Sequence, residues 1–185
     1  MRRKKTAQAR AAFLNRQIKT GFYDVQRGNT IVGTMRSCLQ DGIIMIAQKL
    51  QIEGINRDSV YKACPPSATH DTSLQELLDC EVIGSNMKFK FENYRQLKGG
   101  PSYALLKVKT GPPRLVLADF PDVDEKHAFM YDAVEGYIMD NRKEGKKRFI
   151  ETSDRSTIKR ARHCINSFFN SSRVDIRCVY SCTAK

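Results

Sequence analysis

Several features that define common protein classes are missing from this chain of 185 residues. No apolar run approaches the roughly 18 residues of a membrane-spanning helix, so we expect no contact with a membrane. Its six cysteines are too few and too scattered for a disulfide scaffold in a chain of this length. The start, residues 1–5, is basic but has no apolar core behind it, so we expect no secretory signal. These absences favour an intracellular protein of the cytoplasm or nucleus, with organelle targeting by the basic start left open.

Acidic residues are scarce relative to basic ones. The chain has 20 Asp and Glu against 32 Lys and Arg, a formal net charge of +12. Such a surplus indicates contact with nucleic acid or with an acidic partner surface, although it also fits a surface that is merely basic. Residues 1–20 hold seven basic residues and no acid. We therefore predict a basic N-terminal arm over residues 1–20 and a single domain over residues 21–185, for which an apolar content of 41% is sufficient.

The hydrophobic pattern predicts helices first and strands later. Helical spacing covers residues 38–52, 56–63 and 73–78, and a last helix is expected from 153 or 154 to 169. Extended segments are expected at 22–25, 30–32, 87–91, 103–108, 115–118, 127–131, 137–141 and 174–180, with a charged loop at 142–148. Runs of helices followed by runs of strands are typical of the α+β class.

Cys38 opens the strongest helical pattern, directly after a candidate N-cap, Ser37. Unpaired N–H groups and the helix dipole favour negative charge there, and thus a nucleophilic thiolate. The simpler interpretation is a small buried hydrophobe, since free cysteines are often buried. A histidine far downstream changes the balance between the two interpretations.

His127 begins a predicted strand, and Asp140 and Asn141 end the next one. In a hairpin that turns near residues 134–135, the end of the second strand lies beside the start of the first. A carboxylate or carboxamide there accepts the imidazole N–H and fixes the tautomer, so the other ring nitrogen can face a thiolate. Taken alone, His127 fits a surface position at a strand end and Asp140 fits a turn. Together with Cys38 they supply the nucleophile, base and orienting group of covalent acyl transfer.

This order of residues resembles the papain-like cysteine peptidases over roughly residues 30–142. The layout is similar to the branch that includes bacteriocin-processing peptidases, and also to deubiquitinases and to proteases of viruses and mobile elements. The resemblance implies a papain-like α+β fold, with the cysteine-bearing helix packed on an antiparallel sheet, and a protein or peptide substrate without a cofactor. It assigns Cys38 as nucleophile, His127 as general base and acid, and Asp140, or alternatively Asn141, as the orienting residue.

One part of the family pattern is absent. The family carries a Gln or Asn about six residues before the cysteine for the oxyanion hole, and this chain has Val32 there. Gln26 or Asn29 are the upstream candidates for that role, with the Cys38 backbone N–H as second donor. The departure leaves open whether the site is active or decayed.

The competing hypothesis is a non-catalytic, basic nucleic-acid-binding module. Residues 142–162 hold nine basic residues against three acidic ones. Arg155, Lys159 and Arg162 recur at helical spacing and predict a positive stripe that suits phosphate groups, although a solvated helix face fits equally well. We expect no metal site, because Cys178 and Cys182, with His163 and Cys164, lack the usual spacing of zinc ligands.

Overall fold

The computed structural model describes residues 37–66, 72–140 and 146–185. At its centre is a six-stranded sheet in which neighbouring strands are antiparallel. The strands, in order across the sheet, are β1 (Met87–Glu92), β6 (Asp175–Ala184), β2 (Arg114–Phe120), β3 (Glu125–Asp132), β4 (Tyr137–Asp140) and β5 (Lys146–Phe149). With its helices, this sheet makes the protein α+β, as the sequence predicted.

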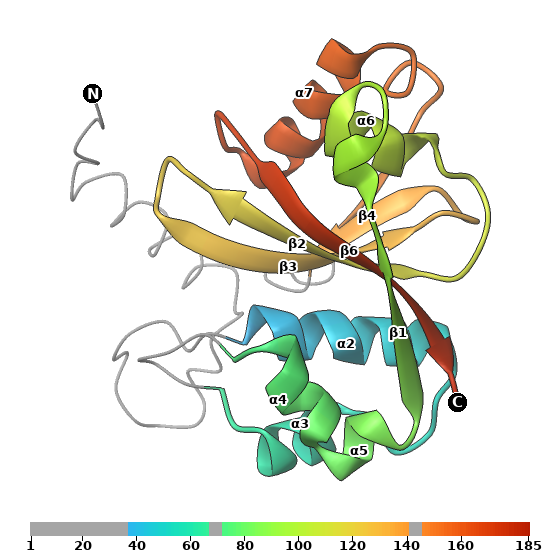
Figure 1. The fold of residues 1–185 in the computed structure, drawn as a ribbon, viewed down its shortest axis with the longest axis vertical. Helices are drawn as coiled ribbons and strands as arrows, with labels where there is room; N and C mark the ends of the chain where they lie inside the picture. The colour runs from blue at the N-terminus through green and yellow to red at the C-terminus, as the bar shows by residue number, and fades with distance from the viewer. Residues whose placement is uncertain (1–36, 67–71, 141–145) are drawn as a thin grey trace.

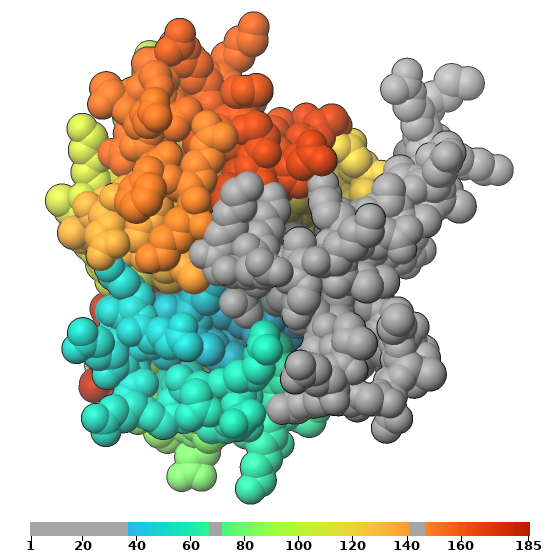
Figure 2. All heavy atoms as spheres, turned by 180° about the vertical axis from the view of Figure 1, so that it is seen from behind, coloured from blue at the N-terminus to red at the C-terminus, as the bar shows by residue number. Residues whose placement is uncertain are grey.

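Helices cover both faces of the sheet (Figure 1). On one side lie α2 (Cys38–Lys49), α3 (Arg57–Ala63), α4 (Leu74–Asp79) and α5 (Glu81–Gly84). On the other side lie α6 (Gly100–Lys107) and α7 (Ile158–Phe169), with the 3-10 turn η2 (Tyr94–Gln96) before α6. Figure 2 shows the layers from behind, with the atoms of α7 and of the β4–β5 region above those of α2 and α3.

Each face of the sheet has its own apolar core. Along β3, Ala128 and Met130 pack with the residues of α2, whereas Phe129 and Tyr131 pack with those of α6 and α7. Successive side chains of a strand point to opposite faces, so this alternation is expected. By the same alternation, His127 lies on the face of Phe129 and Tyr131, toward α6 and α7.

Several predicted elements are present where the sequence placed them. Helix α2 begins at Cys38, and α4 is capped by reciprocal hydrogen bonds between Ser73 and Glu76. The predicted hairpin is formed by β3 and β4, with Met130 opposite Met139. In its turn, Asp132 Oδ1 accepts hydrogen bonds from two backbone N–H groups, each at 2.9 Å. These elements were predictable because local side chains specify them.

The strand predicted at residues 103–108 is wrong, because this segment forms α6. Gly99 takes a left-handed conformation with φ +96° and begins the helix, and Pro101 lies in its first turn, where proline is tolerated. Leu105 and Leu106 are both fully buried. A short apolar run does not distinguish a buried helix from a strand.

Near the C-terminal third, three boundaries differ from the prediction. Residues 146–149 form the edge strand β5 where a loop was expected, and Tyr137 pairs with Phe149. Helix α7 starts at Ile158, later than predicted, because Thr157 accepts the hydrogen bond of the Arg160 N–H and caps it. Strand β6 continues to Ala184. The predicted arm at 1–20 and the extended segments at 22–25 and 30–32 lie outside the described residues.

Candidate functional site

Helix α2 runs along the sheet in the same direction as β3. A Cβ added at Gly42 would lie 3.8 Å from the Cβ of Ala128, the fourth of the eight residues of β3. Lys49, at the other end of the helix, forms an ion pair of 3.0 Å with Asp132, the last residue of β3. Because a helix rises about 1.5 Å per residue, the turn before Gly42 lies at the end of the sheet where β3 begins. Cys38 therefore lies at the same end of the sheet as His127.

Cys38 is the first residue of α2 and is partly exposed. The N-terminal turn provides the N–H groups and the partial positive charge that favour a thiolate. The predicted cap is wrong in one respect: the Ser37 side chain accepts no capping hydrogen bond from a backbone N–H of the first turn. Ser37 instead donates its hydroxyl to the Oδ2 of Asp41 at 2.9 Å.

Asp41 is the centre of a buried polar network behind Cys38. Its Oδ1 accepts a hydrogen bond from the Tyr61 hydroxyl at 2.8 Å and lies 3.6 Å from the Arg57 guanidinium. The carboxyl is 1% exposed, and this burial raises its pKa despite the hydrogen bonds and charge that oppose the rise. The network joins the residue before Cys38 to α3. This network was not predicted from the sequence, although a carboxylate within an apolar helical pattern was a usable signal.

His127 and Asp140 form a buried pair across the β3–β4 hairpin. The Nε2 of His127 lies 3.1 Å from the Oδ2 of Asp140, and the two side chains are 1% and 2% exposed. When Nε2 carries the proton it donates to the carboxylate, and Nδ1 is then the nitrogen that can take up a proton. The juxtaposition expected from the 13-residue spacing is thus present.

Aromatic rings surround the imidazole. The ring centroid of His127 lies 5.6 Å from that of Phe120 on β2 and 5.7 Å from that of Phe169 on α7, both in edge-on geometry. These rings belong to the core on the α7 side, whereas α2 covers the opposite face. The first turn of α2 and the imidazole of His127 therefore lie at the same end of the sheet but on its opposite faces. Because the apolar walls exclude water, the contact between His127 and Asp140 is strengthened.

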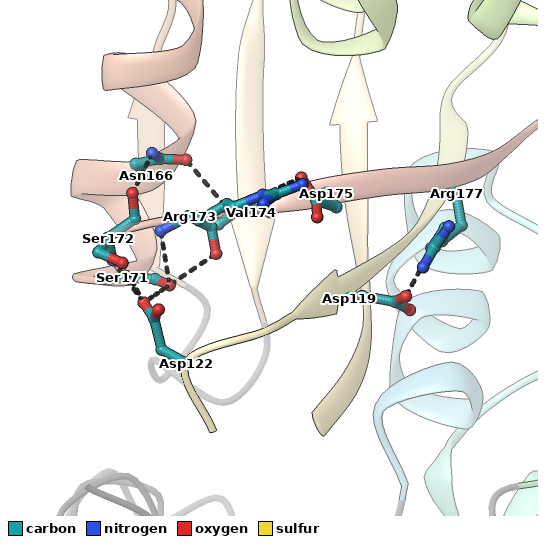
Figure 3. Close-up of polar contacts among 9 residues, drawn as sticks. All are labelled: Asp119, Asp122, Asn166, Ser171, Ser172, Arg173, Val174, Asp175 and Arg177. Carbon is teal, nitrogen blue, oxygen red and sulfur yellow. Dashed lines mark hydrogen bonds and ion pairs between the residues drawn. The ribbon is translucent and has the colours of Figure 1, made fainter. Parts of the chain in front are cut away.

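A polar cluster fixes the loop that follows Phe169 (Figure 3). Asp122, in the β2–β3 turn, accepts hydrogen bonds from the Ser172 N–H at 2.9 Å and the Ser171 hydroxyl at 3.2 Å. Burial raises the pKa of the Asp122 carboxyl, but the bonds from Ser172 and Ser171 outweigh burial and hold it below its usual value. Asn166 Oδ1 accepts the Val174 N–H at 3.1 Å. The cluster ties α7, and with it Phe169, to the end of the sheet that carries His127.

The structure does not place the remaining predicted site residues beside His127 and Asp140. Asn141, Gln26 and Asn29 lie outside the described residues. Arg155 is not on α7 but precedes it, half-buried, with its guanidinium 2.9 Å from the position that a Cβ on Gly136 would take. The prediction that Arg155 shares a helical stripe with Lys159 and Arg162 is therefore wrong.

Lys159 and Arg162 are both exposed on α7, three residues apart. Within the described parts of the chain, no three His, Cys, Asp or Glu side chains gather as a metal site would require. None of the helices described is both long enough and apolar enough to cross a bilayer.

Comparison of the chain with protein-family models, with curated proteins and with solved structures finds no match.

Proposed function

We propose that this protein is a thiol-dependent peptidase with a papain-like arrangement of Cys38, His127 and Asp140. The observation that carries the proposal is the buried contact of 3.1 Å between His127 and Asp140, at the sheet end that the first turn of α2 reaches. A general base needs such a partner, because the carboxylate orients the ring and stabilises the imidazolium that forms during reaction.

In the proposed reaction the Cys38 thiolate attacks the carbonyl carbon of a peptide or isopeptide bond. The proton that left the thiol resides on His127 Nδ1 and passes to the departing amine as the C–N bond breaks. Water then gives a proton to His127 and attacks the thioester, which releases the acid and restores the thiol. The Cys38 backbone N–H at the start of α2 is suited to stabilise the oxyanion. No cofactor is needed, and the substrate class is a protein or peptide, as in polyprotein processing or removal of a ubiquitin-like modifier.

The direct test is the rate of alkylation of each cysteine by iodoacetamide at neutral pH, followed by peptide mapping. Cys164 and Cys182 serve as slowly alkylated references in the same protein, because burial raises the pKa of both thiols to about 12. Cys178, which is partly exposed, is the matched reference for accessibility. We expect Cys38 to react at least about tenfold faster than Cys178 and to lose that advantage in His127→Ala. Equal rates for Cys38 and Cys178 in the unmodified protein would reject the peptidase.

A second candidate function is nucleic-acid binding through α7. Lys159, Arg160 and Arg162 are exposed on this helix, whose sequence contains no acidic residue. Such a face grips phosphate groups without reading bases. A labelled DNA duplex should then bind with strong salt dependence, and Lys159→Glu with Arg162→Glu should remove most of the binding. Retention of full affinity by this double variant would exclude α7 as the site.

A further inference from the structure

Strand β1 is an edge of the sheet. Among the described strands its one neighbour is β6, which pairs with it from Met87 opposite Ala184 to Glu92 opposite Val179. The backbone N–H and C=O groups on the other side of an edge strand can pair with a further extended chain. Figure 1 shows β1 toward the C-terminal end of α2, whereas Cys38 is the first residue of that helix. The edge at β1 is therefore separate from the proposed peptidase site.

A groove of about 830 Å³ follows this edge strand. Its lining includes five of the six residues of β1, together with Ser181 and Thr183 of the neighbouring β6. The groove therefore includes the face of the β1–β6 pair that carries Lys88 and Lys90, beside the open edge of β1.

The charge of the groove is positive. Lys88 and Lys90 are exposed on one face of β1, opposite Thr183 and Ser181 of β6. Glu92 also lines the groove, but it forms an ion pair of 2.9 Å with Arg114. Burial raises the pKa of Glu92, and the hydrogen bonds from Arg114 and Tyr94 outweigh burial, so its pKa is lowered. Glu92 is therefore compensated by its own partner, and the two lysines attract acidic groups.

The other face of β1 is aromatic. Phe89 is half-buried, and Phe91 is 52% exposed, with its ring centroid 5.6 Å from that of Tyr180. Residues directly opposite each other on neighbouring strands share a face. A strand added to β1 would therefore present alternate side chains to lysines and to phenylalanines. The chemistry that fits is an alternation of acidic and apolar residues.

We propose that β1 binds an extended segment of a partner protein, in which acidic and apolar residues alternate, by adding that segment as a strand to the edge of the sheet. Backbone hydrogen bonds supply part of the affinity, and the alternating contacts with Lys88, Lys90 and Phe91 supply the specificity. Because one register brings the acids to the lysines and a shift of one residue brings them to the aromatic face, the register is defined.

The test uses the full-length protein and a fluorescein-labelled peptide, Glu-Val-Glu-Val-Glu-Val, with binding followed by fluorescence anisotropy at low salt. Lys88→Glu with Lys90→Glu should weaken binding about tenfold or more, because like charges would then face each other. The matched control is Lys159→Glu with Arg162→Glu, the same charge change on exposed residues of α7, which should leave the affinity within about twofold. Phe91→Ala should weaken binding as well, without changing any charge.

Two further probes separate strand addition from simple attraction of charge. A peptide of the same composition in block order, Glu-Glu-Glu-Val-Val-Val, should bind clearly less well, since it cannot satisfy both faces. Hydrogen exchange should slow at the amides of β1 when the alternating peptide binds. Equal binding of the block peptide, equal loss in the α7 variant, or no binding by the unmodified protein up to about 1 mM peptide would overturn the proposal. Displacement of the peptide by a single-stranded oligonucleotide of equal charge at lower concentration would also overturn it, in favour of a nucleic-acid site.

Discussion

Gly42 of α2 lies against Ala128 of β3, the residue that follows His127. The small size of both residues lets the helix approach the strand closely, and a Cβ on Gly42 would already come within 2.8 Å of the Leu115 side chain. This contact is one helical turn from Cys38. The spacing between the helix that carries the proposed nucleophile and the strand that carries the proposed base is thus set by a residue without a side chain.

Replacing Gly42 by leucine should separate α2 from β3. We expect Gly42→Leu to lower the free energy of unfolding by about 1–3 kcal/mol through overpacking, and to lower the alkylation rate of Cys38 to that of Cys178. Gln48→Leu adds the same side chain at an exposed position of α2 and is the matched control for both measurements. A Gly42→Leu protein that keeps fast Cys38 alkylation would show that the spacing of α2 and β3 does not control the thiol.

Asp140 is expected to act through His127 rather than on the substrate. Asp140→Ala leaves the buried imidazole without this acceptor, which should cost about 1–3 kcal/mol of stability and slow Cys38 alkylation about tenfold or more. Asp140→Asn keeps an oxygen that can accept the Nε2–H bond. It should therefore retain more of the stability and more of the Cys38 alkylation rate than Asp140→Ala does. If the two variants alkylate at the rate of the unmodified protein, Asp140 has a structural role only.

Asp41 should make stability depend on pH in an unusual direction. Burial raises its pKa above 3.8, the value of an unperturbed carboxyl, so the folded state holds this proton more tightly than the unfolded state. The stability from this group is fully present below about pH 4 and is lost as pH rises through the folded pKa. Asp41→Asn cannot titrate, so in urea unfolding from pH 4 to 7 the variant should gain stability relative to the unmodified protein as pH rises.

Tyr61→Phe supplies the complementary test of the Asp41 network. It removes a hydrogen bond that lowers the pKa of Asp41. The pH-dependent loss of stability should therefore extend to higher pH than in the unmodified protein. Parallel stability curves for the unmodified protein, Asp41→Asn and Tyr61→Phe would contradict the assignment.

Gly84, the last residue of α5, lies so close to the backbone of α4 that a side chain does not fit there. A Cβ there would lie 2.0 Å from the backbone carbonyl oxygen of Leu78, so either α4 or α5 must move. We expect Gly84→Ala to lower the thermal and urea midpoints, at a cost of about 1–3 kcal/mol or more. Ser85→Ala, at the exposed neighbouring position, should change stability by less than about 0.5 kcal/mol. Similar midpoints for the two variants would mean that α4 and α5 adjust freely.

The parts of the fold that were predictable are those that neighbouring residues specify. The hairpin of β3 and β4 follows from two alternating patterns and a turn, and it is this hairpin that brings Asp140 to His127. The start of α7 after Thr157 and the helix at residues 100–107 were not predicted, because more than one local pattern fitted each of these segments.

Other features depend on contacts between distant parts of the chain. The bond from Tyr61 to Asp41 joins residues 20 positions apart, and Phe169 of α7 meets His127 of β3 although 42 positions separate them in the sequence. Periodicity carries no information on such pairs, because they arise from how α3 and α7 pack. The charge pattern indicated a basic surface but placed Arg155 on a helix that begins after it.

The position of β6 has a consequence for the order in which the chain can fold. This strand, the last described in the sequence, lies between β1 and β2, one strand in from the edge of the sheet. A nascent chain that has not reached residue 175 therefore leaves β1 without its partner and β2 with an open edge. Pairings between residues so far apart form late and slowly. The groove along β1 therefore cannot form before residues 175–184 have been synthesised, and a chain cut short within β6 would expose unpaired strands to aggregation rather than release a smaller working protein.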